Sequence, residues 1–175
     1  MYKRQTQYPS DQASYVVNFN VSPTAQMDMF AIECGANRCV RLQRIVIDNP
    51  GALTAGALVG LTLVFTTAAG TGSVVTPVAV DQYDSPFTGI CRSGNTGGNL
   101  GTAGSTLATY TLWTPTTPAG AFTPLVLEMG GQGQVYKQPT VKLGVANGIA
   151  LRHPGAAGAA GFVGYAVFVE EPQVP

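Results

Sequence analysis

The amino-acid sequence predicts an all-β sandwich or barrel, and three observations carry that prediction. Short apolar segments with a period of two outnumber segments with the 3.6-residue period of a helix. The chain holds 22 glycines and 12 prolines, which separate these segments as turn residues do. Only 10 % of the residues are charged, against about 25 % in an average soluble domain, so the Lys and Glu that cover helices are scarce. At 175 residues we expect one domain with about ten short strands.

Residues 1–13 are polar, show no apolar periodicity and are predicted to form an N-terminal arm. Tyrosine and arginine contribute strongly to protein interfaces, so the candidate contacts on the arm are Tyr2, Lys3, Arg4 and Tyr8. A passive, disordered terminus is the alternative. No apolar stretch follows the first charges, so we expect no signal peptide and assembly in a cytosol.

The next three strands are predicted over residues 15–21, 27–32 and 40–47. In the third, the apolar phase moves by one residue between Leu42 and Ile45, which predicts a β-bulge. A helix with apolar residues at 42, 45 and 46 is the alternative. The β-branched residues 45–47, followed by Asp-Asn-Pro-Gly, favour a strand and a turn.

Two further strands are predicted over residues 58–67 and 74–80. Pro77 interrupts the second, which therefore belongs at a sheet edge or a bulge. Residues 81–106 are rich in glycine, serine, threonine and asparagine, and they are predicted to form a long loop. Loops of that length inside a compact domain are usually functional or disordered.

The last strands are predicted over residues 107–114, 124–128, 140–145, 148–152 and 162–170. The Asn147-Gly148 pair is typical of a type I′ hairpin turn, because both residue types tolerate positive φ. The sandwich domain is expected to span residues 14–171, with a short C-terminal tail at 172–175.

The charge balance argues against several classes of partner. Nine basic and nine acidic residues cancel, so there is no overall field to attract nucleic acid or an anionic membrane. Arg38, Arg41 and Arg44 lie close together in the sequence. Surface or interface ion pairs are a better interpretation of them than a nucleic-acid patch.

Residues that could carry chemistry are few. His153 is the only histidine, no nucleophile motif accompanies it, and it is predicted to be a turn residue at a strand end. Asp81 and Asp84 could bind calcium, but the spacing of a calcium loop is missing, and Asx hydrogen bonds in turns explain them. We therefore expect no catalytic residue, no metal site and no cofactor.

The cysteines are interpreted as buried free thiols. Cys34, Cys39 and Cys91 are odd in number, which argues against a disulfide framework. A Cys34–Cys39 bridge or two ligands of a metal site are the alternatives. One histidine leaves such a metal site without partners, so we expect reduced cysteines that bind no metal.

Several sequence motifs together resemble those of a known protein family. Residues 29–35 read Met-Phe-Ala-Ile-Glu-Cys-Gly and lead into Val-Arg-Leu-Gln-Arg-Ile-Val-Ile at 40–47. Pro-Val-Ala-Val-Asp at 77–81 precedes the glycine-rich segment, and Asn-Gly-Ile-Ala-Leu-Arg at 147–152 precedes a last strand ending in Phe-Val-Glu-Glu. Across residues 15–171 this pattern resembles the small virion proteins of tailed bacteriophages.

The resemblance implies a jelly-roll-like antiparallel β-sandwich of about eight to ten strands. It also implies a non-enzymatic virion protein of the head-decoration, head-fibre or tail-associated type, and we expect a capsid decoration or cement subunit. The expected partners are the major capsid protein or other virion proteins, and further copies of the chain, with a trimer favoured.

Two other functions remain open at this point. A tail- or fibre-associated module could bind a host-surface glycan through an aromatic ring, and Trp113 is the only tryptophan, although a core position is favoured for it. A cupin-type enzyme would share the double-sheet fold. It needs several histidine ligands, so a single histidine nearly excludes it.

Overall fold

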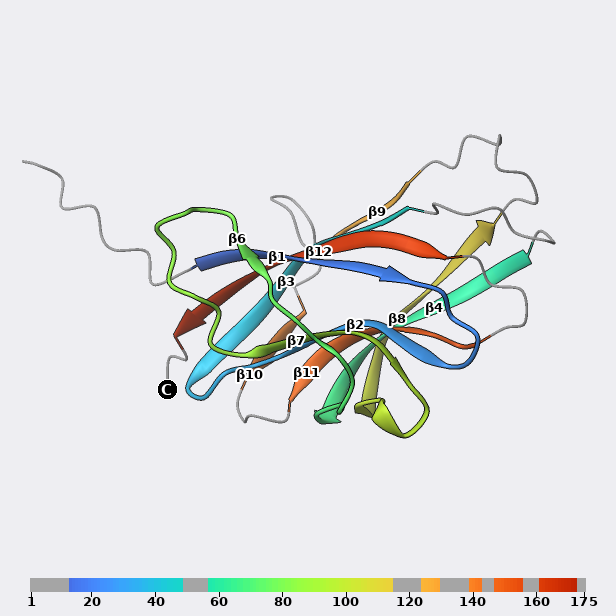
Figure 1. The fold of residues 1–175 in the computed structure, drawn as a ribbon, viewed down its shortest axis with the longest axis horizontal. Coiled ribbons are helices and arrows are strands. Elements are labelled where there is room, and N and C mark those ends of the chain that lie inside the picture. The colour runs from blue at the N-terminus through green and yellow to red at the C-terminus, as the bar shows by residue number, and fades with distance from the viewer. Residues whose placement is uncertain are drawn as a thin grey trace, which may run out of the picture.

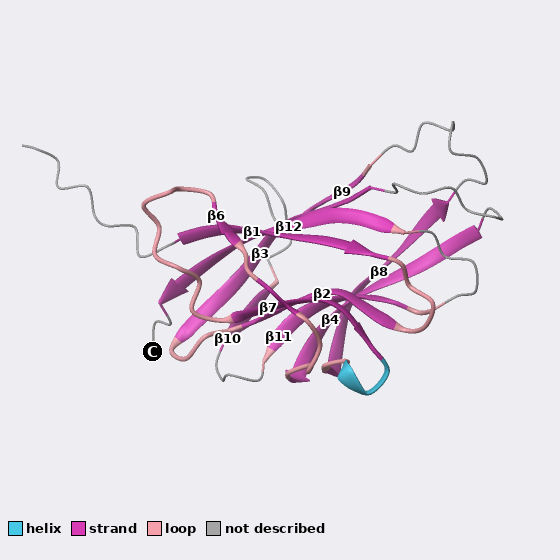
Figure 2. Ribbon diagram, viewed as in Figure 1, coloured by secondary structure: helices cyan, strands magenta, loops and turns pink. Residues whose placement is uncertain are grey.

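In the computed structural model, two antiparallel six-stranded sheets pack face to face as a β-sandwich (Figure 1). The structure describes residues 13–48, 57–114, 124–129, 139–142, 147–155 and 161–172. Within these residues the only helical element is a short 3-10 turn, Gly97–Asn99 (Figure 2). The predicted all-β sandwich is therefore confirmed.

The first sheet, called sheet A, has the strand order β10-β3-β12-β1-β6, and β9 also pairs with β3. Sheet B has the order β5-β7-β2-β11-β4-β8. The strands in chain order are β1 Ala13–Val21, β2 Met27–Glu33, β3 Arg38–Asp48, β4 Ala57–Ala68, β5 Val74–Val75, β6 Val78–Ala79, β7 Ile90–Thr96, β8 Thr102–Thr114, β9 Leu125–Glu128, β10 Thr140–Lys142, β11 Gly148–His153 and β12 Phe162–Pro172.

Alternate residues of each sheet fill the core between the two layers. On β1, the side chains of Tyr15, Val17 and Phe19 point inward and are buried, as the period of two predicts. Aromatic rings meet at one end, where the Tyr15 ring lies 5.5 Å from Phe168 and 5.3 Å from Phe87 between centroids. Such offset and tilted contacts stabilise a core beyond simple burial.

The predicted β-bulge in β3 is confirmed. Val167 pairs with Arg44 and the next residue, Phe168, pairs with Leu42, so Gln43 is the extra residue. Because of that extra residue, both Leu42 and Ile45 point into the core although they are three positions apart.

The interruption at Pro77 divides the predicted 74–80 strand between the two sheets. β5 pairs with β7 at the edge of sheet B, and β6 pairs with β1 at the edge of sheet A. These pairings confirm the predicted edge position. Its physical reason is that proline has no N–H to donate to the hydrogen-bond ladder of a central strand.

The prediction of one long loop over residues 81–106 is wrong. Strand β7, the 3-10 turn and the start of β8 all lie within it. The sequence of β7, Ile-Cys-Arg-Ser-Gly-Asn-Thr, has no apolar alternation, and in the structure only Cys91 and Asn95 of this strand are buried. It pairs through its backbone with β2, which is buried along its whole length.

The prediction of a hairpin at Asn147-Gly148 is also wrong. β10 belongs to sheet A and β11 to sheet B, so the two strands are not neighbours. Gly148 lies inside sheet B between Glu33 and Thr66, and a Cβ there would come within 2.6 Å of the Ile32 carbonyl oxygen. The glycine therefore permits close strand packing and does not form a turn.

Candidate functional site

The residues proposed as interface contacts on the N-terminal arm, Tyr2, Lys3, Arg4 and Tyr8, lie outside the described residues. Trp113 belongs to β8, where its backbone pairs with Leu58 of β4. The surface features that the structure does describe come from other parts of the chain.

Exposed apolar side chains gather along one side of the sandwich. Segment 74–80 is extended and alternates, with Val75 and Ala79 packed against the core. The opposite side of the segment is exposed and carries Thr76 and three valines, Val74, Val78 and Val80, at 66 %, 61 % and 63 % exposure; these valines are named the valine stripe below. Since β5 is an edge of sheet B and β6 is an edge of sheet A, the backbone of this segment crosses from one sheet to the other on one side of the sandwich (Figure 1).

The valine stripe continues toward the residues that follow it. Tyr83 is 86 % exposed and Ile90 is 36 % exposed. Of the seven exposed large apolar side chains in the described part of the chain, five lie between residues 74 and 90. Scattered exposed apolar residues are normal, whereas contiguous apolar patches occur at interaction surfaces, so this part of the chain is the candidate contact surface.

The turn after the stripe is held by the two aspartates. The Tyr83 backbone N–H donates to Asp81 Oδ1 at 2.9 Å, and the Ser14 backbone N–H donates to Asp84 Oδ2 at 3.1 Å. The Asx hydrogen bond predicted from the sequence is confirmed for Asp81, whereas Asp84 instead binds the backbone of β1. Together these bonds fix the position of Tyr83 relative to β1.

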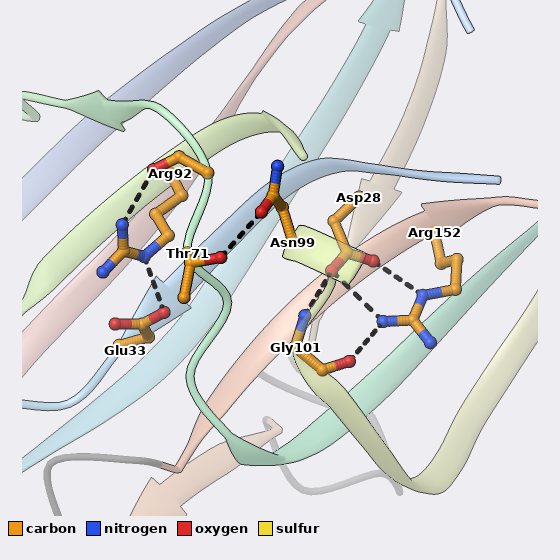
Figure 3. A network of polar contacts seen from close by, with 8 residues as sticks. Asp28, Glu33, Thr71, Arg92, Asn99, Gly101 and Arg152 are labelled. Carbon is orange, nitrogen blue, oxygen red and sulfur yellow. Dashed lines mark hydrogen bonds and ion pairs between the residues drawn. The ribbon is translucent and has the colours of Figure 1, made fainter. Parts of the chain in front are cut away.

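A buried ion pair lies on the outer side of sheet B (Figure 3). Arg152 on β11 donates to both carboxylate oxygens of Asp28 on β2, at 2.7 and 3.1 Å. Gly101 closes the group, since its N–H donates to Asp28 at 3.3 Å and its carbonyl accepts from Arg152 at 2.8 Å. Asp28 has no exposed surface.

A second ion pair lies beside the first (Figure 3). Arg92 on β7 donates to Glu33 on β2 at 3.0 Å and to the carbonyl of Gly72 at 2.8 Å. The segments that join β4 to β5 and β7 to β8 bond to each other there, because the Thr71 N–H donates to the Asn99 carbonyl at 3.0 Å. The ion pairs thus bind these two connections to the sheet.

Some buried polar atoms in this region lack a protein partner. Asn95 is 1 % exposed, and neither its amide oxygen nor its amide nitrogen has a described partner. Its side chain packs so closely on Gly72 that a Cβ at residue 72 would overlap it.

His153 ends β11, as the sequence predicts, but it is fully buried and not a loop residue. Its Nδ1 accepts the Gly155 N–H at 2.9 Å, and its ring lies 5.6 Å from that of Phe162. Burial lowers the pKa of the imidazole. Nε2 has no described partner, and the ring stabilises a turn in neutral form.

The three cysteines are buried free thiols in the structure. Cys34 Sγ contacts the carbonyls of Arg38 and Val141 at 3.3 and 3.4 Å. Burial raises the pKa of the Cys34 thiol to about 11, and burial also raises the pKa of Cys91. Thiols held in the protonated form are poor nucleophiles.

Two of the three clustered arginines form surface ion pairs, as predicted. Arg41 pairs with Glu171, and Arg44 pairs with Glu128 at 2.6 Å with both side chains about half exposed. Among the described residues no three His, Cys, Asp or Glu side chains are grouped as a metal site would require. No helix in the described ranges is long and apolar enough to cross a membrane.

A shallow groove of about 500 Å³ lies on the outer face of sheet A. Tyr165 of β12 stands between Asn18 of β1 and Val46 of β3, and in the next row Val163 stands between Asn20 and Asp48. The lining therefore combines the aromatic residues Tyr165 and Phe19 with amide and carboxylate side chains.

Comparisons with known proteins identify no relative. No family model, no curated protein and no solved structure matches the chain. The resemblance to phage virion proteins thus rests on the sequence motifs alone.

Proposed function

We propose that the chain is a non-enzymatic structural protein of a tailed-bacteriophage virion, most closely a capsid decoration or cement subunit. The observation that carries the proposal is the valine stripe, together with the exposed Tyr83 and Ile90 that follow it in the sequence. The resemblance of the sequence motifs supplies the virion context. The major capsid protein or another virion protein would be the partner, and the virion the location.

The valine stripe has the physical properties of an adhesive surface. An ordinary edge segment exposes mostly polar residues on its outer side, whereas here three of the four exposed residues of segment 74–80 are valines and the fourth is Thr76. Burying a valine is worth about 1.5–3 kcal/mol when it starts fully exposed. The three stripe valines are about two-thirds exposed, so covering them would supply a useful part of a standard interface, which buries about 800 Å² per partner.

The buried ion pairs support the same proposal by making the scaffold rigid. Both connections that cross toward the two edges of sheet B are bonded to each other and to buried charged groups. A rigid surface loses little entropy on binding, so more of the contact energy remains as affinity.

The test is binding of the purified protein to particles that lack it, with Val78→Asp compared with the wild type. We expect Val78→Asp to lower particle occupancy at least about tenfold, since a charge would be desolvated in the contact. Val126→Asp is the matched control, because Val126 is 50 % exposed but lies on β9, away from the stripe.

Electron micrographs of particles with and without the protein would show where it binds. If Val78→Asp binds as well as the wild type, the stripe is not the contact. If the wild type binds no particle of the phage that encodes it, the virion proposal fails.

A second candidate function is glycan binding by a tail- or fibre-associated module. The groove on sheet A favours it, because Tyr165 could stack on a sugar ring while Asn18, Asn20 and Asp48 bond to its hydroxyls. Glycan-array binding that is lost in Tyr165→Ala, with the fold intact, would support this function. Loss in Trp113→Ala alone would place the site on β8, and no binding to any glycan would eliminate the candidate.

A further inference from the structure

Strand β8 is a long edge with exposed backbone groups. It forms the end of sheet B, pairs with β4 on one side, and spans 13 residues (Figure 1). No pairing on its other side is described. Along an edge strand, every second residue points its N–H and C=O groups away from the sheet, where they can bind another strand.

The second half of this edge lacks the usual protection against pairing. Natural edges are blocked by charged side chains, by proline, or by being very short. β8 contains no proline, and the chain has no charged residue and no histidine from Ser93 to Leu127. The register shifts against β4 all fall between Leu63 and Ala68, so the second half of β8 pairs regularly.

The side chains of β8 also suit a further strand. Leu107 and Tyr110 point toward the core but are only partly buried, because the sandwich ends beside them. Thr109 and Thr111 are exposed on the outer side. An added strand would cover the first two residues, and cross-strand threonine pairs are favourable in sheets.

The lengths of the other edge strands indicate which strand could pair with β8. The remaining described edge strands, β5, β6, β9 and β10, have 2, 2, 4 and 3 residues. None of them is long enough to pair with β8. Within the described part of this chain, the one edge that matches β8 in length is β8 of another copy, and neutral strands pair with themselves without repulsion between like charges.

We propose that β8 pairs antiparallel, edge to edge, with β8 of a second copy of this chain. The two sheets B then form one continuous sheet across a two-fold axis. Such an isologous contact is closed, since it uses the long edge of both copies and cannot extend into a fibre. It gives a dimer, in contrast to the trimer that the sequence resemblance implies. It does not depend on the virion role.

The first test is the molecular mass in solution, measured by sedimentation over a range of concentrations. We expect the wild type to have twice the 18.1 kDa mass of the chain. Thr109→Lys places a charge on the outer face of the edge strand and should raise the dimer dissociation constant by about tenfold or more. Thr24→Lys, an exposed threonine between β1 and β2, is the matched control and should leave the dimer intact.

The second test uses single cysteines at residues 106, 109 and 111 of an otherwise wild-type chain. In a two-fold antiparallel pair, only a residue near the axis meets its own copy, so one position should form an intermolecular disulfide much faster than the others. The native cysteines are buried and give little background. A wild-type monomer, a trimer, or Thr109→Lys with unchanged mass and no cross-link at any position would overturn the proposal.

Discussion

At Asp28, a carboxylate without exposed surface is bonded to Arg152 and to the Gly101 N–H, so its burial is compensated. Glu33 is less completely satisfied, because Oε2 has no described partner while Oε1 binds Arg92. These charges face away from the apolar core and lie under the chain connections. Their hydrogen bonds are directional and so fix the path of those connections. Apolar side chains make no directional bonds and could not do this.

Removing one partner of the buried pair should therefore be costly. For Arg152→Met we expect a loss of about 3–5 kcal/mol in the free energy of unfolding, because Asp28 would remain buried without its cation. The matched control is Arg44→Met, which breaks a half-exposed pair with Glu128 and should cost at most about 1 kcal/mol. Urea denaturation measures both, and equal losses would contradict the structural role of Asp28–Arg152.

His153 should make stability depend on pH. Its folded-state pKa is lowered by burial, so between that pKa and the unfolded value near 6.5 the unfolded chain binds more protons. Stability is then complete above about pH 6.5 and falls as the pH decreases, by at most about 1.4 kcal/mol per pH unit.

Because His153 is the only histidine, one variant isolates this effect. His153→Leu loses the bond to the Gly155 N–H and should be less stable at pH 7, but its stability should change less between pH 7 and 5. Urea midpoints at several pH values measure the slope. A variant slope equal to that of the wild type would show that other groups control the acid response.

At the scale of elements, the sequence predicted correctly those features of the strands that depend on neighbouring residues alone. The extra residue in β3 and the edge position at Pro77 follow from the apolar phase and from a missing N–H. β7 was missed because its polar residues make backbone pairs and ion pairs that have no sequence period. β11 likewise pairs with β2 and β4 of sheet B and not with β10, which precedes it in the chain, so Asn147-Gly148 indicated a turn where the fold needs close strand packing.

The valine stripe could have been found from the sequence. Segment 74–80 has apolar residues in both phases of its alternation, although Pro77 assigns it to an edge, where one side should be polar. The buried ion pairs could not have been found that way. Asp28 and Arg152 are far apart in the chain and meet only through the pairing of β2 with β11.

Over the whole molecule, the two proposed contacts lie on different sides. The valine stripe follows the β5 and β6 edges, and β8 is at the opposite end of sheet B. A dimer formed through β8 therefore leaves both stripes free. Two stripes on one particle-bound dimer would act together, and the second contact would form at a high effective concentration.

Deletion of residues 1–11 tests what the N-terminal arm adds to these contacts. The described sandwich begins with β1 at Ala13, so we expect the truncated chain to keep its fold and its unfolding midpoint. We also expect weaker incorporation into particles, because Tyr2, Lys3, Arg4 and Tyr8 would be missing from the contact. Ordering the arm costs roughly 1–2 kcal/mol per residue for the backbone, so the arm strengthens binding only where contacts with a neighbour exceed that cost. The measurement is the occupancy of particles by truncated and full-length protein at equal concentration, with circular dichroism as the control for folding. Equal occupancy would make the arm a passive tail and leave the valine stripe as the attachment surface.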